Sequence, residues 1–100
     1  MITYEITASV PEALRQRYEV YMREQHIPDL LTTGAFAAAS ISRSAPGRYR
    51  IRYEALDRAA LDRYLADHAP RLRDHFARTF PDGIEVTREE WEVLESWSGR

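Results

Sequence analysis

Two segments of this sequence alternate between apolar and polar residues. In residues 2–9, every even position is apolar and every odd position is polar. In residues 48–55, the odd positions include Tyr49, Ile51 and Tyr53, whereas the even positions are all charged. A period of two places successive side chains on opposite faces of a strand. The pattern therefore predicts two strands, each with one face in a hydrophobic core and one polar face.

The segment between the first strand and residue 34 has the pattern of a helix interrupted by proline. Ser9 and Glu12 have the spacing of a capping box, with Ser9 as the predicted N-cap. Apolar residues then recur at helical spacing, namely Leu14, Tyr18, Tyr21 and Met22. Pro28 lacks a backbone donor and is expected to bend or break this helix. Gly34 is the expected stop.

The rest of the chain predicts a hairpin, a second helical region and a last strand. Residues 35–43 and 48–55 are expected to pair across a turn at residues 44–47. Asp57 is the predicted N-cap of a helix whose apolar stripe ends at His68, and Pro70 separates it from a further helix. Residues 84–86 and 91–97 are strand-like. The apolar phase changes between them, so we expect a bulge or irregular loop at residues 87–90.

The order strand, helix, strand, strand, helix, strand is typical of the ferredoxin-like fold. We therefore predict an α+β protein with a βαββαβ order, in which residues 1–100 form a single domain and a four-stranded antiparallel sheet carries its helices on one face. The residues expected under the helices are Tyr4, Ile6, Tyr49, Ile51 and Tyr53. The residues expected on the opposite face are Thr3, Glu5, Thr7, Arg50, Arg52 and Glu54.

This second sheet face is polar and suits either solvent or a second copy of the chain. We expect a homodimer that joins through it. In the usual strand order the first and third strands are antiparallel neighbours, which would place Glu5 beside Arg50 or Arg52. Trp91 and Trp97 are candidate interface anchors because tryptophan is enriched at interfaces.

Composition excludes several kinds of partner and site. The formal net charge is −2, so the chain lacks the basic balance typical of nucleic-acid binding. It contains neither lysine nor cysteine, which excludes amine nucleophiles, disulfides and thiolate metal ligands. No run approaches the ~20 apolar residues of a membrane span, and the start of the chain lacks the pattern of a signal peptide. We expect a cytoplasmic protein with no membrane partner.

His26 and His68 are the candidate catalytic residues. Each ends an apolar helical stripe, precedes a proline by two residues, and follows a tyrosine of the same stripe, Tyr18 or Tyr64. Each is therefore suited to general acid–base chemistry or a ligand contact in the space between helices and sheet. In the alternative interpretation, each histidine only hydrogen-bonds free carbonyls at the end of its helix, where a positive charge is also favourable.

A small-molecule ligand in that space would contact Tyr18, Met22, Tyr49 and Tyr64. Arg71 is a further candidate, together with Arg73, because both follow Pro70 at a helix start and are suited to an anion, although an exposed helical face is the favoured explanation for both. The two helical regions run antiparallel, which keeps His26 and His68 too far apart to share a metal ion, and His75 is expected to be exposed. We therefore expect no metal and no cofactor, with haem left open because one histidine suffices as its axial ligand.

Four segments resemble an uncharacterised bacterial family of the dimeric α+β-barrel superfamily: MITYEITASV, HIPDLLTTGAF, YRIRYEA and RYLADHAPRLRDHF. The resemblance covers nearly the whole chain and implies a ferredoxin-like fold and a homodimer. It implies no particular activity. The wider superfamily includes cofactor-independent monooxygenases, haem-binding proteins and isomerases, whose ligands usually lie between the helices and the sheet of each subunit.

Three functions remain open. The first is a homodimeric protein that binds a small apolar or aromatic ligand between helices and sheet. The second is a cofactor-independent monooxygenase- or isomerase-type enzyme with His26 or His68 as acid and base. The third is an interaction module without a ligand, whose sheet face serves assembly only.

Overall fold

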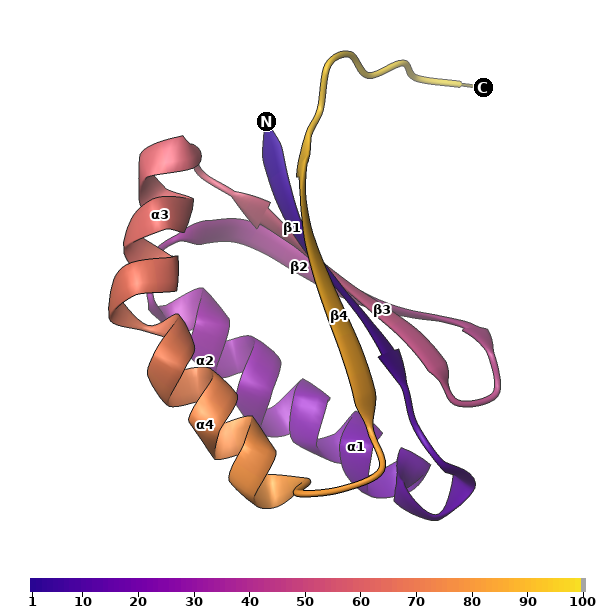
Figure 1. The fold of residues 1–100 in the computed structure, drawn as a ribbon. Helices are drawn as coiled ribbons and strands as arrows, with labels where there is room; N and C mark the ends of the chain where they lie inside the picture. The colour runs from indigo at the N-terminus through magenta and orange to yellow at the C-terminus, as the bar shows by residue number, and fades with distance from the viewer. Residues whose placement is uncertain (100) are drawn as a thin grey trace.

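The computed structural model describes residues 1–99 as one sheet covered on one face by helices, as Figure 1 shows. The strands are β1 (Ile2–Ser9), β2 (Phe36–Ala45), β3 (Arg48–Ala55) and β4 (Glu85–Glu92). Their order in the sheet is β2-β3-β1-β4, and every neighbouring pair is antiparallel. The predicted ferredoxin-like α+β fold is confirmed.

The helical layer consists of two antiparallel rods that lie side by side across the sheet (Figure 1). The first rod joins η1 (Glu12–Leu14), α1 (Arg15–Tyr21), η2 (Met22–His26) and α2 (Ile27–Thr32). The second joins α3 (Arg58–Asp67) and α4 (Ala69–Thr79). No helix among the described residues is both long and apolar enough to cross a membrane.

The two alternating segments form strands with the predicted bounds, because each buries its apolar face under the helices. Tyr4, Ile51 and Tyr53 are buried there. On the other face, Glu5 pairs with Arg52 in the register of β1 and β3, and their side chains form an ion pair at 3.8 Å. The predicted pairing of opposite charges is thus confirmed for Arg52. We call this uncovered face the open face; it includes Thr3, Glu5, Thr7, Arg50, Arg52, Glu54 and Trp91.

Proline changes the first rod without ending it. The segment η2 has π-helical hydrogen bonding, and the N–H of Ile27 donates to the carbonyl of Met22 five residues earlier. Pro28 follows directly, at the start of α2. Because proline has no N–H and its ring crowds the carbonyl four residues earlier, a wider turn before it avoids both problems. Gly34, at φ 81°, ends the rod as predicted.

The cap of the second rod is confirmed, whereas the cap of the first is wrong. The backbone N–H of Ala60 donates to Oδ1 of Asp57 at 2.7 Å. Ser9 remains the last residue of β1, and Pro11 precedes η1 without a side-chain cap. The backbone N–H of Val10 donates instead to the carbonyl of Gly47 at 2.8 Å. The chain therefore follows the sheet edge to Val10 before it turns into the helix.

The predicted bulge at residues 87–90 is also wrong. β4 pairs with β1 in one uninterrupted register from Glu85 to Glu92. The apolar phase changes because the strand uses both faces: Val86 packs against the core, whereas Trp91 lies on the open face opposite Thr3. Regular strand structure ends at Glu92, short of the predicted Trp97. The irregularities occur in β2 instead, near its two ends.

Candidate functional site

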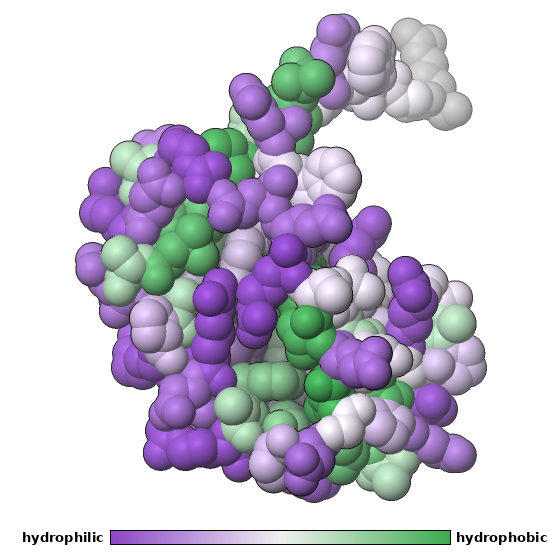
Figure 2. All heavy atoms as spheres, in the orientation of Figure 1, coloured by the Kyte–Doolittle hydropathy of each residue, from purple (hydrophilic) through white to green (hydrophobic). Residues whose placement is uncertain are grey.

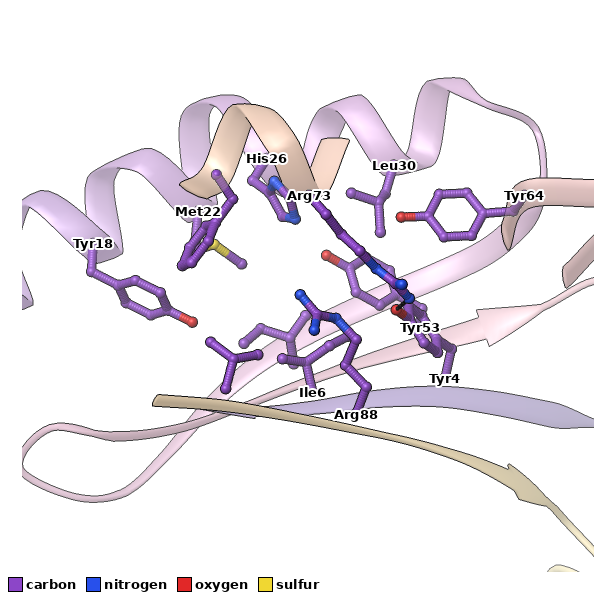
Figure 3. A pocket seen from close by; sticks show the side chains of 13 residues that line it. Tyr4, Ile6, Tyr18, Met22, His26, Leu30, Tyr53, Tyr64, Arg73 and Arg88 are labelled. Atoms are coloured by element: carbon purple, nitrogen blue, oxygen red, sulfur yellow. Dashed lines mark hydrogen bonds between the residues drawn. The ribbon is translucent and has the colours of Figure 1, made fainter. Parts of the chain in front are cut away.

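A cavity of about 30 Å³ lies between the helical layer and the sheet. The first rod supplies four lining residues spaced by four: Tyr18, Met22, His26 and Leu30. The sheet supplies Tyr4, Ile6, Ile51, Tyr53, Val86 and Arg88, and the second rod supplies Tyr64, Arg73 and Phe76. In Figure 3, Tyr18 and Tyr64 point toward this space from opposite sides, and His26 reaches it from the helix.

The π-helical segment explains how four residues of one rod reach the same cavity. Four residues of an α-helix turn about 40° beyond one full turn, so a spacing of four drifts around the helix. The wider π turn takes more residues per turn and offsets this drift. Met22 and His26, the first and last residues of η2, therefore share a face with Tyr18 and Leu30.

The cavity is aromatic and contains an unsatisfied hydroxyl. Tyr53 is only 1% exposed, and its hydroxyl has no hydrogen-bond partner. Its ring packs against Phe36 and Tyr4, with ring centres 5.1 and 6.1 Å away. Burial raises the pKa of Tyr53 above the usual range of a phenol, so the hydroxyl stays protonated. A buried donor without a partner costs about 1–3 kcal/mol.

His26 is partly buried and flanked by aromatic rings. Its imidazole stacks on Tyr21 at 5.7 Å and meets the edge of Phe76 at 5.8 Å. Burial lowers the pKa of His26 from 6.5 to about 4; Asp29 opposes this shift, whereas Arg88 and His75 add to it. His26 is therefore neutral at pH 7, and a neutral imidazole offers one donor nitrogen and one acceptor nitrogen.

Two arginines meet at the side of the cavity formed by α4 and β4. A terminal nitrogen of Arg73 donates to the hydroxyl of Tyr4 at 2.9 Å. Arg88 lies opposite Ile6 in the register of β1 and β4, on the face covered by helices. Figure 3 shows both guanidinium groups directed into the same space. None of the lining residues is acidic.

The structure brings together only some of the residues predicted from the sequence. Tyr18, Met22, Tyr64 and His26 line the cavity. His68 lies at the junction of α3 and α4, where its Nδ1 is 2.9 Å from a terminal nitrogen of Arg71, and neither residue lines the cavity. Tyr49 is buried outside the cavity lining, with its ring 5.0 Å from that of Tyr18.

His75 is exposed, as expected, but it has a specific contact. Its Nδ1 lies 2.6 Å from the hydroxyl oxygen of Tyr21, and its ring stacks on Tyr21 at 5.7 Å. The Tyr21 ring thus lies between His75 at the surface and His26 at the cavity. Among the described residues, no group of three histidine or carboxylate side chains has the arrangement of a metal site.

Sequence reasoning did not assign Tyr4, Tyr53 or Arg88 to the site. Tyr4 and Tyr53 were placed under the helices as packing residues. Arg88 shares its even phase with Ile84 and Val86, so a continuous final strand would have placed it on the cavity side. Because a bulge was expected at residues 87–90, this shared phase was not extended to Arg88.

Comparisons with known proteins give a family and a fold. The profile of a family described as a domain of unknown function, DUF4286, matches residues 1–94. No curated protein matches the sequence significantly.

Three solved structures illustrate the fold similarity. SnoaB from Streptomyces nogalater, a cofactor-independent oxygenase, is 16% identical over 95% of this chain and 94% of its own, with a TM-score of 0.73. HapK from Hahella chejuensis is 22% identical over 100% and 99%, with a TM-score of 0.67. A dimeric ferredoxin-like protein from an uncultured marine organism is 16% identical over 96% and 97%, also with a TM-score of 0.67. At these identities the similarity establishes the shared fold.

Proposed function

This chain belongs to DUF4286, a family of unknown function, and we propose that it binds a small aromatic ligand carrying a hydrogen-bond acceptor in the cavity between helices and sheet. The observation that carries this proposal is the buried, unpaired hydroxyl of Tyr53. If Tyr53 served packing alone, phenylalanine would fill the same space without the cost of an unpaired buried hydroxyl. A hydrogen bond from this hydroxyl to an acceptor on a ligand would offset that cost. The surrounding rings of Phe76, Tyr18 and Tyr64 suit a flat apolar ligand.

The volume of the cavity sets a condition on binding. About 30 Å³ accommodates roughly two water molecules, whereas an aromatic ring needs more space. Arg73 and Arg88 are exposed overall, and long exposed side chains change rotamer at little cost. A ligand therefore enters between α4 and β4 by moving these two side chains, and the side chains that line the cavity shift to make room for its ring.

Benzamide is a suitable probe because it combines one ring with a carbonyl acceptor. We expect titration with benzamide to shift the amide NMR signals of residues in η2, β3 and α4. Tyr53→Phe should weaken this binding about tenfold, the equivalent of one buried hydrogen bond. Tyr49→Phe is the matched control, because Tyr49 lies on the same strand outside the cavity lining. Absence of shifts at millimolar benzamide, or equal weakening by both variants, would contradict the proposal.

A second candidate function is favoured by the position of His26. His26 and the Tyr53 hydroxyl line the same cavity, and together a neutral imidazole and a hydroxyl donor can remove a proton from a carbon acid and stabilise the resulting enolate. This step begins both enolate isomerisation and direct reaction with oxygen. The test is deuterium exchange at carbon 1 of 2-tetralone in D₂O. Exchange that depends on His26, and persists in His68→Gln, would favour an enzyme over a binding protein.

We further propose a homodimer that joins through the open face. Thr3 on this face is only 1% exposed, and the charges of Glu5, Arg52 and Glu54 form ion pairs with separations of 3.8 and 3.4 Å. Paired charges lower the cost of covering such a face with a second copy. Light scattering should give a dimer mass for the wild-type chain and for Arg63→Glu on the exposed side of α3. Arg50→Glu should shift the protein toward monomer; a wild-type monomer would refute the dimer.

A further inference from the structure

The side of the cavity between α4 and β4 carries two positive charges that form no ion pair with a carboxylate of residues 1–99. The ion pairs formed by residues 1–99 include neither Arg73 nor Arg88. Figure 2 shows hydrophilic side chains on both sides of a hollow in this region of the surface. Two like charges directed into one space repel each other, and the repulsion grows where apolar walls exclude water.

Two acidic residues near these arginines form ion pairs with other residues. Asp74, next to Arg73 on α4, forms an ion pair with Arg78 at 2.9 Å. Glu90, on the same face of β4 as Arg88, forms an ion pair with Arg58. Asp74 and Glu90 thus have other partners, and the two guanidinium groups remain available to a ligand.

The hydrogen-bond donors of Arg73, Arg88 and Tyr53 all belong to the lining of the same cavity. A terminal nitrogen of Arg73 donates to the hydroxyl of the buried Tyr4, so the guanidinium group lies at the cavity in the absence of a ligand. Arg88 approaches from the sheet, and the unpaired Tyr53 hydroxyl lies within the cavity lining. Three donors from three elements therefore converge beside aromatic walls. A guanidinium binds carboxylate oxygens more strongly than neutral oxygens because the hydrogen bond is charge-assisted.

We propose that the ligand of this cavity is an aromatic anion, a ring bearing a carboxylate or an equally compact anionic oxygen, whose charge is bound by Arg73 and Arg88. This inference rests on the proposed binding function and specifies its ligand class. The ring occupies the space between Tyr18, Phe76 and Tyr64. The anionic group faces the opening, where it lies between the guanidinium groups of Arg73 and Arg88. Its attraction to both groups offsets their mutual repulsion.

Benzoate and benzamide provide a direct test because they have nearly the same shape and differ in charge. Both are titrated into the full chain at pH 7.5, and their dissociation constants are compared. We expect benzoate to bind at least about tenfold more tightly than benzamide, since charge-assisted hydrogen bonds are roughly twice as strong as hydrogen bonds between neutral groups. Arg73→Gln and Arg88→Gln should each reduce this preference, and the double variant should abolish it, because the lost charges attract benzoate more strongly than benzamide.

Arg71→Gln is the matched control, because Arg71 lies two residues from Arg73 on α4 but contacts His68 outside the cavity. It should leave the preference for benzoate unchanged. Benzamide binding is also an internal check that each variant is folded. Equal affinity for both probes, or a preference that depends on Arg71 rather than Arg73 and Arg88, overturns the anionic ligand and leaves the aromatic-binding function standing. Failure of both probes to bind overturns both.

Discussion

The hydroxyl of Tyr49 donates a hydrogen bond of 2.6 Å to Oε2 of Glu19. Tyr53 lies four residues further along β3, on the same face, and its hydroxyl has no hydrogen-bond partner. One strand thus presents two buried tyrosines, one whose polar group is satisfied within the protein and one whose polar group is not. We therefore assign a structural role to the hydroxyl of Tyr49 and a binding role to that of Tyr53, and the same substitution to phenylalanine tests both.

We predict that Tyr49→Phe and Tyr53→Phe have opposite effects on stability without ligand. Tyr49→Phe removes a hydrogen bond to a carboxylate and should lower the free energy of unfolding by about 1 kcal/mol. Tyr53→Phe removes an unsatisfied polar group and should leave that free energy unchanged or raise it by up to about 1 kcal/mol. Urea unfolding monitored by circular dichroism measures both. A clear loss of stability in Tyr53→Phe would indicate that its hydroxyl has a partner within the protein.

The contribution of the Tyr49 hydrogen bond should disappear in acid. The Tyr49 hydroxyl, together with Arg43 and Arg23, lowers the pKa of Glu19 below its usual value. A carboxyl whose pKa is lowered in the folded state stabilises the protein above its unfolded pKa of about 4, and this contribution is lost as the pH falls through the folded value. The stability difference between wild type and Tyr49→Phe should therefore be full at pH 7 and smaller at pH 3. A difference that is constant across this range would contradict it.

We predict that His26 titrates well below the usual range of a histidine. Its pKa of about 4 lies below the value of about 6.5 expected in the unfolded chain. The unfolded state then takes up a proton first as the pH falls, so the stability associated with His26 is present above pH 6.5 and is lost toward pH 4. Between pH 7.5 and 5.5 this amounts to about 1 kcal/mol. Histidine ring signals in NMR would give the pKa directly.

Replacement of His26 should remove this pH dependence. We expect His26→Gln to lose less stability than wild type between pH 7.5 and 5.5, whereas His68→Gln should retain the wild-type slope. His68 is the matched control because it lies at a helix junction outside the cavity lining. An unchanged slope in His26→Gln would show that other groups produce the pH dependence.

Two glycines with the same backbone conformation should respond differently to alanine. Gly34 and Gly47 have φ values of 81° and 80°. A side chain in this left-handed region costs about 1–2 kcal/mol, and this is the whole cost expected at Gly34, where a Cβ would have no neighbour within 4 Å. At Gly47 a Cβ would lie 2.6 Å from the Val10 carbonyl oxygen. Gly47→Ala should therefore be distinctly more destabilising than Gly34→Ala, as measured by thermal unfolding; equal losses would contradict this difference.

The sequence was most informative where one physical effect dominated. β1 and β3 could be predicted because their alternating apolar residues, among them Tyr4, Ile51 and Tyr53, are buried under the helices. Asp57 could be predicted as a cap because its hydrogen bond to Ala60 is local. Ser9 has similar local chemistry, but the sheet extends its pairing to Arg48 and holds it in β1. A long-range contact therefore overrode a local preference.

The candidate site depends on contacts that no local pattern specifies. His26 and Tyr18 could be assigned to the cavity from helical spacing, but Arg73 and Arg88 approach each other only because α4 lies over β4. The hydrogen bond between His75 and Tyr21 likewise joins two rods whose relative position depends on packing. Prediction from the sequence thus identified the aromatic residues of the first rod and named Arg73 as an anion candidate, but it missed Arg88 and the meeting of the two arginines at the cavity.

The π-helical segment makes the first rod one residue longer than an α-helix needs between its two anchors in the core. Twelve residues separate Tyr18 from Leu30, both about 1% exposed. An α-helix with eleven would bring them back to within about 20° of the same direction, whereas twelve would leave them about 120° apart. The surplus residue is thus taken up in residues 22–26, next to the ligand cavity. Deletion of Gln25 combined with Pro28→Ala should leave a folded protein with both anchors in place and the imidazole displaced, so the length of this rod can be altered by one residue at the cost of the site rather than of the fold.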